Sequence, residues 1–135
     1  MAPMMPPRAL ALLLWSATPD RPDLTVTPLV HAVSACALDC RVELHFAGPA
    51  VRWLVTGVAE AAYPTAGREK SIGEWLHEIA AAGGVLRACS MACAAWVAPD
   101  ERLVECWGGG RAFGMAGATA FVARTLDPGW RTLVF

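Results

Sequence analysis

Apolar residues occur in runs that predict five strands. Residues 9–15 (ALALLLW) form an unbroken apolar run, which is typical of a parallel strand that helices cover on both faces. In residues 41–48 apolar and polar positions alternate, which predicts a strand buried mainly on one face and lying toward a sheet edge. Shorter apolar runs predict strands over residues 85–89, 102–107 and 130–135.

Helical spacing fills the segments between these strands. Residues 24–40 predict a first helix with Pro28 in its first turn, and residues 49–64 predict a short second helix. The glycines at 108–110 predict a turn, and residues 111–125 predict a last helix that its internal glycines loosen.

Two further helices have start signals of their own. Ser71 and Glu74 have the spacing of a capping box, which predicts a helix that ends at the Gly-Gly pair at 83–84. Ser90 is expected to cap a second helix, directly after the strand over residues 85–89.

Strands that alternate with helices predict the α/β class, with right-handed crossovers between parallel strands. We expect a single-domain three-layer sandwich over residues 9–135, with a mostly parallel five-stranded sheet of flavodoxin-like order and helices on both faces. Residues 1–8 begin MAPMMPP, whose three prolines predict a flexible N-terminal tail.

Composition and charge narrow the classes of partner. Hydrophobic residues make up 56% of the chain and charged residues 17%, so part of the surface is expected to be buried between the subunits of a homo-oligomer. The net charge is -1 and the 11 Lys and Arg residues are scattered singly, so no basic face exists for nucleic acid. No uninterrupted apolar run reaches the roughly 20 residues of a membrane span. We therefore expect neither nucleic acid nor a membrane as partner.

The cysteine content bears on the cellular compartment. Five cysteines, an odd number, do not suit a disulfide framework, so we expect free thiols and a cytoplasmic location. Residues 8–17 (RALALLLWSA) also have the basic, apolar and small residues of a secretory signal. The alternative for these residues is the central parallel strand that the rest of the pattern requires.

Cys89 is the candidate nucleophile, because ligands of an open parallel sheet collect beyond the carboxyl ends of its strands, where the strand order reverses. In the order 2-1-3-4-5 the first and third strands are neighbours, and Cys89 would face the loop of Ser16 and Thr18. A helix beginning at Ser90 would favour the thiolate form of Cys89. Arg87 points to the same face of the strand and would add positive charge. Ser16, Thr18, Arg87 and Ser90 are therefore candidate substrate-binding residues.

Packing is the competing explanation for Cys89 and for Cys93, the candidate second catalytic thiol, because cysteine is among the most buried residue types. For Cys36, Cys40 and Cys106 we expect packing. Zinc knuckles and thioredoxin-type motifs prefer C-x-x-C spacing, which the segment CSMAC lacks, so we expect no metal and no other cofactor.

The other candidate motifs are weak. His31, His45 and His77 have no nearby serine and acid to suggest a triad, so we expect each at the surface or an interface. The segment GGGRAFG lacks the G-x-x-x-x-G-K-[ST] pattern of a phosphate-binding loop.

The order of these parts resembles the DsrE/DsrF-like family (DsrEFH superfamily) of small sulfur-relay proteins. The resemblance covers residues 9–135. Its most specific part is residues 83–110, GGVLRACSMACAAWVAPDERLVECWGGG, with a strand, a cysteine, a short helix, an acidic turn, a short strand and a glycine turn. The resemblance implies a flavodoxin-type sheet assembled into a dimer, trimer or hexamer. It also implies that Cys89 receives persulfide sulfur from a donor protein and passes it to an acceptor protein.

The leading prediction is thus a sulfur carrier or sulfurtransferase with Cys89 as acceptor. The resemblance does not assign a role to Cys93, which, if close, can attack a Cys89 persulfide, release sulfide and leave a disulfide. The alternatives are a non-catalytic oligomeric binding domain whose cysteines only pack, and a thiol-disulfide redox sensor that uses Cys89 and Cys93.

Overall fold

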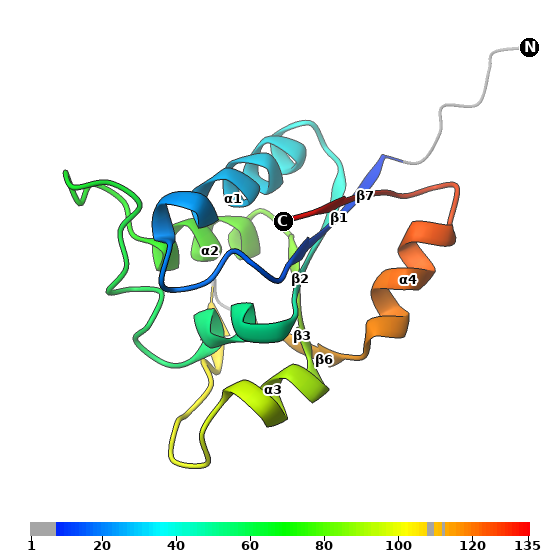
Figure 1. Ribbon diagram of the computed structural model, residues 1–135. Coiled ribbons are helices and arrows are strands. Elements are labelled where there is room, and N and C mark those ends of the chain that lie inside the picture. The colour runs from blue at the N-terminus through cyan, green and yellow to red at the C-terminus, as the bar shows by residue number, and fades with distance from the viewer. Residues whose placement is uncertain (1–7, 108–109, 112) are drawn as a thin grey trace, which may run out of the picture.

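The chain folds into a parallel sheet between layers of helices (Figure 1). The structure, a computed structural model, describes residues 8–107, 110–111 and 113–135. Within these residues five strands form the sheet in the order β6-β3-β2-β1-β7, and every neighbouring pair is parallel. The strands are β1 (Ala9–Leu14), β2 (Arg41–Phe46), β3 (Val85–Cys89), β6 (Gly114–Ala116) and β7 (Arg131–Val134).

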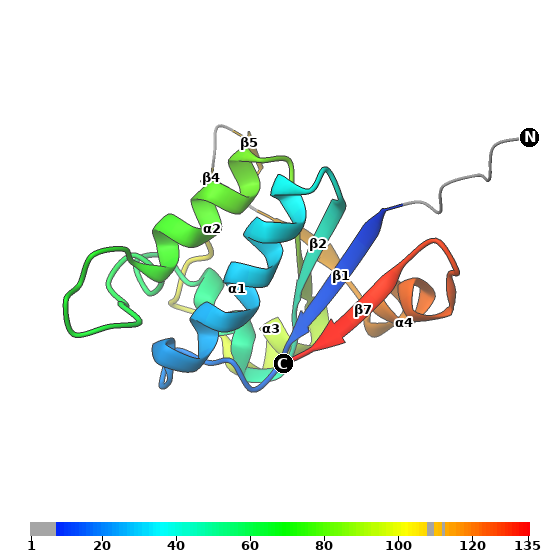
Figure 2. The ribbon, with the colours of Figure 1, turned by 90° about the horizontal axis from the view of Figure 1, so that it is seen from above.

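Helices cover both faces of this sheet (Figure 2). α1 (Pro22–Ala37) and α2 (Ile72–Ala81) lie side by side on one face, and α4 (Ala118–Leu126) lies on the other. The chain steps in one direction from β1 through β2 to β3, so right-handed crossovers put α1 and α2 on the same face. The return from β6 to β7 runs the other way and carries α4 across the opposite face. The predicted three-layer α/β sandwich is confirmed.

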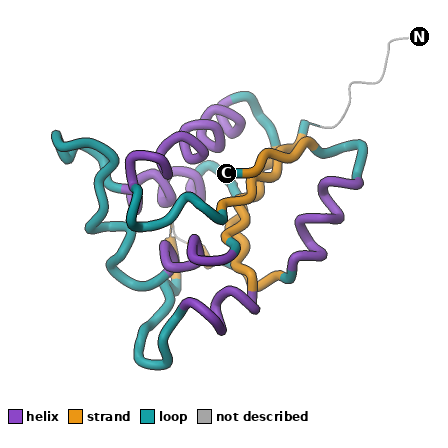
Figure 3. The backbone as a smooth tube through the Cα atoms, in the orientation of Figure 1, coloured by secondary structure: helices purple, strands orange, loops and turns teal. Residues whose placement is uncertain are grey.

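Shorter elements complete the path of the chain (Figure 3). The 3₁₀ helix η1 (Gly48–Leu54) follows β2, and α3 (Ser90–Trp96) follows β3. β4 (Cys106–Trp107) and β5 (Gly110–Arg111) pair as an antiparallel hairpin outside the main sheet.

The helix predicted over residues 49–64 is only partly present, because η1 ends at Leu54. Val55 forms an isolated bridge to Leu103 instead of continuing the helix. Gly57 then takes a φ of +85°, a left-handed conformation that a right-handed helix cannot contain.

The main core lies between the sheet and the pair α1 and α2. Leu12, Leu44 and Leu86 come from three neighbouring strands and are all buried on this face. Trp53 of η1 closes the core at one end, and its indole N–H donates a hydrogen bond to the carbonyl of Ala17 at 2.8 Å. A separate, smaller core forms under α4 around Phe121, Trp130 and the small residues of β1.

The capping box of α2 is confirmed. Ser71 Oγ accepts a hydrogen bond from Glu74 N–H, and a Glu74 carboxylate oxygen accepts one from Ser71 N–H. The first helix, however, begins at Pro22, so Pro28 lies inside it rather than in its first turn. Pro22 itself occupies the first turn, where a missing N–H costs nothing.

The fourth strand of the main sheet is β6. The segment predicted to supply it, residues 102–107, contributes only β4 to the separate hairpin. β6 comes from the amino-terminal part of the segment predicted as the last helix, which begins only at Ala118. Glycine weakens a helix interior by about 1 kcal/mol relative to alanine, and Gly114 and Gly117 stand within three residues of each other there. Gly117 serves as the N-cap of α4.

The alternating pattern of β2 predicted a strand toward an edge of the sheet. This prediction was wrong, because β2 lies between β1 and β3 at the centre of the sheet. Its polar residues Glu43 and His45 face α4 and are almost fully buried, at 5% and 4% exposure. The alternation therefore marks a buried polar face and not a solvent-facing one.

Three further points concern the ends and surface of the chain. The predicted tail lies outside the described residues except for Arg8, whose carbonyl accepts a hydrogen bond from Arg41 N–H at 2.8 Å. The predicted glycine turn over residues 108–110 lies mostly outside them as well. In the part of the chain that the structure describes, none of the helices has the length and apolar character that a bilayer span requires.

Candidate functional site

Cys89 is the last residue of β3, as predicted, and lies where the connections from two neighbouring strands diverge. The connection from β3 runs through α3, which packs into the core on the α1 and α2 face. The connection from β6 crosses to the opposite face through α4. Such a divergence opens a crevice beyond the strand ends.

The crevice expected between the first and third strands does not exist, because β2 separates β1 from β3. The divergence lies instead between β3 and β6, where Cys89 and Ala116 are paired neighbours. Cys89 therefore reaches a switch point of the sheet, although not the one that the order 2-1-3-4-5 implies.

A cavity of about 160 Å³ opens at this divergence, and Cys89 is part of its wall. Most of the lining is apolar, and among the described residues that form it, only Cys89 and His45 have ionisable side chains. The walls come from the carboxyl ends of β1, β2, β3 and β6 and from the start of α4: Leu13, His45, Phe46, Ala47, Ala88, Cys89, Ala116, Gly117, Ala118, Phe121 and Val122.

Cys89 and Cys93 are neighbours with different environments. Cys89 is partly buried and is the N-cap residue of α3, whereas Cys93 is buried one turn later. Burial raises the pKa of the Cys93 thiol, and the nearby Cys89 raises it further. Cys93 is therefore a poor nucleophile at neutral pH, and Cys89 is the better candidate of the two.

The other predicted site residues are spread over the sheet. Ser90 is exposed and its side chain caps nothing, because Cys89 occupies the N-cap position. Arg87 directs its guanidinium toward Glu43, with Arg87 Nη2 4.0 Å from Glu43 Oε2. Ser16 and Thr18 follow β1, beyond the intervening β2, and neither lines the cavity of Cys89.

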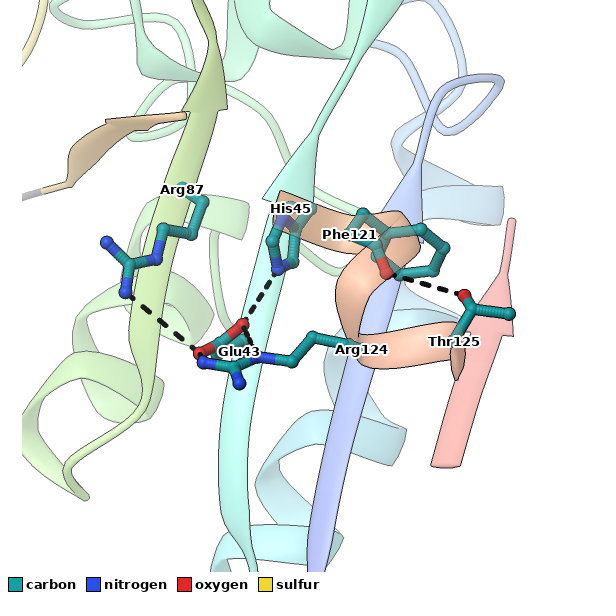
Figure 4. Close-up of polar contacts among 6 residues, drawn as sticks. All are labelled: Glu43, His45, Arg87, Phe121, Arg124 and Thr125. Carbon is teal, nitrogen blue, oxygen red and sulfur yellow. Dashed lines mark hydrogen bonds and ion pairs between the residues drawn. The ribbon is translucent and has the colours of Figure 1, made fainter. Parts of the chain in front are cut away.

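A buried polar cluster lies beside the cavity, under α4 (Figure 4). Arg124 of α4 donates two hydrogen bonds to the carboxylate of Glu43, from Nε to Oε1 at 3.1 Å and from Nη2 to Oε2 at 2.7 Å. His45 Nε2 lies 3.0 Å from Glu43 Oε1, and the His45 ring meets the edge of Phe121 at 5.3 Å between centroids. The imidazole is thus held between a carboxylate and an aromatic ring.

Burial and charge act in opposite directions on this pair. Burial by itself raises the pKa of Glu43, but the hydrogen bonds from Arg124 and His45 outweigh it and hold that pKa below its usual 4.5. Burial lowers the pKa of His45 below 6.5 and outweighs the attraction of Glu43. At neutral pH the pair therefore consists of a carboxylate and a neutral imidazole whose Nε2–H donates to Glu43.

Glu43, His45 and Arg124 were not among the predicted site residues, and the prediction of a surface or interface position for His45 was wrong for this structure. The signal that could have found them is the spacing Glu43-x-His45 in a strand, which puts both side chains on one face. Arg124 had no comparable signal, because it lies 81 residues from Glu43 along the chain.

The remaining cysteines and histidines lie away from this site. Cys36 and Cys40 pack partly against the main core, and burial raises the pKa of Cys36. Cys40 and the exposed His31 line an open groove of about 600 Å³ at the amino ends of β1 and β7. Among the described residues no three His, Cys, Asp or Glu side chains are grouped so that they could hold a metal ion.

No protein-family model and no curated protein sequence matches the chain. The crystal structure of the YchN protein from E. coli is similar to it, with a TM-score of 0.70 and 14% identity over 96% of this chain and 99% of that one. The structure of MTH1491, a protein of unknown function from Methanobacterium thermoautotrophicum, has a TM-score of 0.58 and 17% identity over 96% and 99% of the two chains. The chain therefore shares its α/β sandwich fold over nearly its whole length with YchN and MTH1491.

Proposed function

We propose that the chain is a sulfur carrier that receives persulfide sulfur on Cys89 and passes it to an acceptor protein. The observation that carries this proposal is the position of Cys89 in the wall of a small, mainly apolar cavity at a switch point of the sheet. The resemblance of residues 83–110 to the DsrE/DsrF-like family points to the same residue and the same chemistry.

Sulfur transfer makes two demands on the site. A thiolate must attack the terminal sulfur of a donor persulfide, which forms the new S–S bond to Cys89 and breaks the old one, so that the donor leaves as a thiol. The terminal sulfur must then be protected from other thiols in solution until the acceptor protein binds. The apolar cavity beside the partly buried Cys89 meets the second demand, whereas the first requires a group that takes the thiol proton.

The same proposal includes donor and acceptor proteins and a homo-oligomer as the working form. Several large apolar side chains around the α4 side of the site are exposed, including Met115 at 54%, Val122 at 50% and Leu126 at 78%. Burial of these side chains against another protein would shelter the mouth of the cavity, since exposed apolar patches commonly mark interaction surfaces.

The experiment is intact-protein mass spectrometry after brief incubation with a polysulfide. We expect the wild type and the variants Cys93→Ser and Cys106→Ser to gain sulfur, and Cys89→Ser to gain none. Cys106 is the matched control because it is exposed and free. Equal sulfur gain by all four proteins, or gain by none, contradicts the carrier function.

Two further measurements separate the other functions. Formation of a Cys89 to Cys93 disulfide on mild oxidation, without any persulfide, is the result that a redox sensor requires; a non-reducing peptide map detects it. A fall of many degrees in the melting temperature of Cys89→Ser would show that Cys89 serves packing, as a purely structural binding domain requires.

A further inference from the structure

His45 and Cys89 line the same cavity from adjacent strands. The register of the sheet pairs His45 with Arg87, so Cys89 stands two residues further along β3 on the same face, one diagonal step from His45. Side chains in such a diagonal relation on one face of neighbouring strands point to the same side of the sheet, and both of these line the one cavity. With 4% exposure, His45 has little contact with bulk water, and the cavity is the space that it shares with Cys89.

The orientation of the imidazole is fixed by its other contacts. Glu43 Oε1 accepts a hydrogen bond from His45 Nε2–H, which leaves Nδ1 as the nitrogen with a free lone pair in the neutral ring. The Phe121 ring packs against the imidazole. Arg124 donates one hydrogen bond to each carboxylate oxygen of Glu43 and so holds that carboxylate in place. Trp130 in turn supports Arg124, whose guanidinium carbon lies 4.1 Å from the centroid of the tryptophan ring.

We propose that His45 is the acid–base partner of Cys89, and that Glu43 and Arg124 are positioning residues that hold its tautomer. A histidine oriented by a carboxylate and placed beside a nucleophile is the arrangement by which thiols and hydroxyls are activated on unrelated folds. This inference rests on the proposed function for its substrate, a persulfide, but not for the pairing of the two side chains.

The proton balance of the step is simple. His45 takes the proton from the Cys89 thiol, and the resulting thiolate attacks the terminal sulfur of the donor persulfide. The S–S bond of the donor breaks, its electron pair stays on the departing sulfur, and His45 returns the proton to that sulfur. Cys89 ends as a persulfide and the donor as a thiol, with no external oxidant or reductant.

The groups around His45 favour the neutral ring that this role needs. Glu43 on the same strand attracts a proton, whereas Arg87 on β3 and Arg124 on α4 repel one, and burial opposes the charge most strongly. The ring is therefore available as a base at neutral pH, because its pKa lies below the usual 6.5 of histidine.

The first test measures thiol reactivity, which is independent of sulfur transfer. Iodoacetamide labelling of Cys89 is followed by peptide mass spectrometry from pH 5.5 to 9.5 (about the range over which a histidine and a thiol titrate), with exposed Cys106 as internal reference. We expect His45→Gln to slow Cys89 labelling relative to Cys106 by at least about tenfold near pH 7, within the range for a positioned base. The rates should converge at alkaline pH, where hydroxide in the solvent takes over the role of the base. His31→Gln, in the distant groove, is the matched control and should leave the profile unchanged.

Superimposable pH profiles of the wild type and His45→Gln would overturn the proposal. If labelling follows the expectation but no sulfur is loaded from polysulfide, the pairing holds and the carrier function fails. The two proposals can thus fail separately.

The second test needs no substitution in the core. Long-range ¹H–¹⁵N spectra of the wild type should show the Nε2-protonated tautomer of His45, and alkylation of Cys89 should shift the Nδ1 resonance of His45 but not that of His31. A proton on Nδ1, or a His45 resonance that does not respond, contradicts the assignment.

The third test separates positioning from packing. Arg124→Gln removes the bonds to Glu43, whereas Arg41→Gln removes only the other guanidinium that stacks on Trp130, at 5.2 Å. We expect Arg124→Gln to shift the pH profile of Cys89 labelling and Arg41→Gln to leave it in place. Equal profiles for the two variants would show that Arg124 has only a structural role.

Discussion

Among the described residues, Glu43 is the one acidic side chain that is buried. Its carboxylate receives two hydrogen bonds from Arg124 and one from His45, while its side chain has almost no contact with water. A carboxylate in that position is stable only with its partners, because an unpaired buried charge is costly. The cluster therefore ties β2 to α4 as much as it orders the site.

Glu43→Gln is expected to destabilise the fold by about 2–3 kcal/mol, because it leaves Arg124 without its anionic partner in a partly buried position. The matched control is Asp23→Asn, which breaks the exposed pair of Asp23 with Arg21 and should produce no measurable change. Urea unfolding of the wild type and both variants measures the difference. Equal unfolding midpoints for Glu43→Gln and the wild type would contradict the role given to Glu43.

At the scale of single residues the sequence identified Cys89 but not the partners of the proposed site. Cys89 could be found because its position follows from local rules, a strand followed directly by a helix. The environment of His45 could not, since it depends on α4 folding back over a strand far away in the sequence. A charged residue in an alternating strand is usually exposed, and only the tertiary fold reverses that expectation.

Local signals also decided which elements were predicted well. The capping box of α2 and the continuous apolar run of β1 involve neighbours in sequence, and both were found where expected. The order of strands depends on long-range pairing and on which edge β6 joins, and no local pattern encodes either. β6 itself has only three residues, which is too short for a periodic signal.

The two serines at predicted helix starts differ in the structure. The buried Ser71 accepts a hydrogen bond on Oγ from Glu74 N–H at 3.1 Å, whereas the Ser90 side chain makes no capping hydrogen bond. Ser71→Ala should lower the free energy of unfolding by about 1 kcal/mol, the usual cost of a lost N-cap, and Ser90→Ala should change it by less than about 0.5 kcal/mol. Thermal unfolding followed by circular dichroism tests this, and a larger loss in Ser90→Ala than in Ser71→Ala would reverse the assignment of the caps.

A second ion pair holds the end of α3, the helix that carries Cys93. Glu101 accepts two hydrogen bonds from Arg52 of η1, each at 2.8 Å, and one from the N–H of Ala98 at 2.9 Å. These hydrogen bonds lower the pKa of Glu101 to about 2, and those from Arg52 contribute most. The loop after α3 is therefore pinned to the segment that follows β2.

Glu101→Ala should release this loop while leaving the sheet intact. The observable is hydrogen exchange at the amide of Ala98, which loses its acceptor and should exchange faster. Asp100→Ala changes the neighbouring acid and should have little effect. Unchanged exchange at Ala98 in Glu101→Ala would mean that this carboxylate does not order the loop.

For the molecule as a whole, acid is expected to reduce stability. The lowered pKa values of Glu43 and Glu101 give stability that is fully present above pH 4.5 and is lost as the pH falls through their folded values, about 2 for Glu101. The lowered pKa of His45 acts in the same direction, because below pH 6.5 the unfolded chain binds a proton that the folded chain resists. All three groups therefore oppose folding in acid.

Urea unfolding at pH 7, 5.5 and 4 (about the span over which histidine and carboxylates titrate) should show a stability that falls steadily with pH. The fall should be smaller in His45→Gln, because this variant lacks the imidazole whose pKa burial lowers in the folded chain. A stability that rises on acidification, or an equal fall in both proteins, would contradict the charge states described for this cluster.

The position of β7 also has a consequence for synthesis of the protein on the ribosome. β1 is made first, yet one of its two neighbours in the sheet is β7, whose backbone pairing continues to Phe135 through hydrogen bonds with Leu13 and Trp15. Until those residues leave the exit tunnel, β1 presents an apolar edge with unpaired N–H and C=O groups, the kind of edge that recruits other strands. From the synthesis of β1 until that of β7, the nascent chain thus carries an apolar strand with one open edge, and a chaperone that covers this edge would protect it.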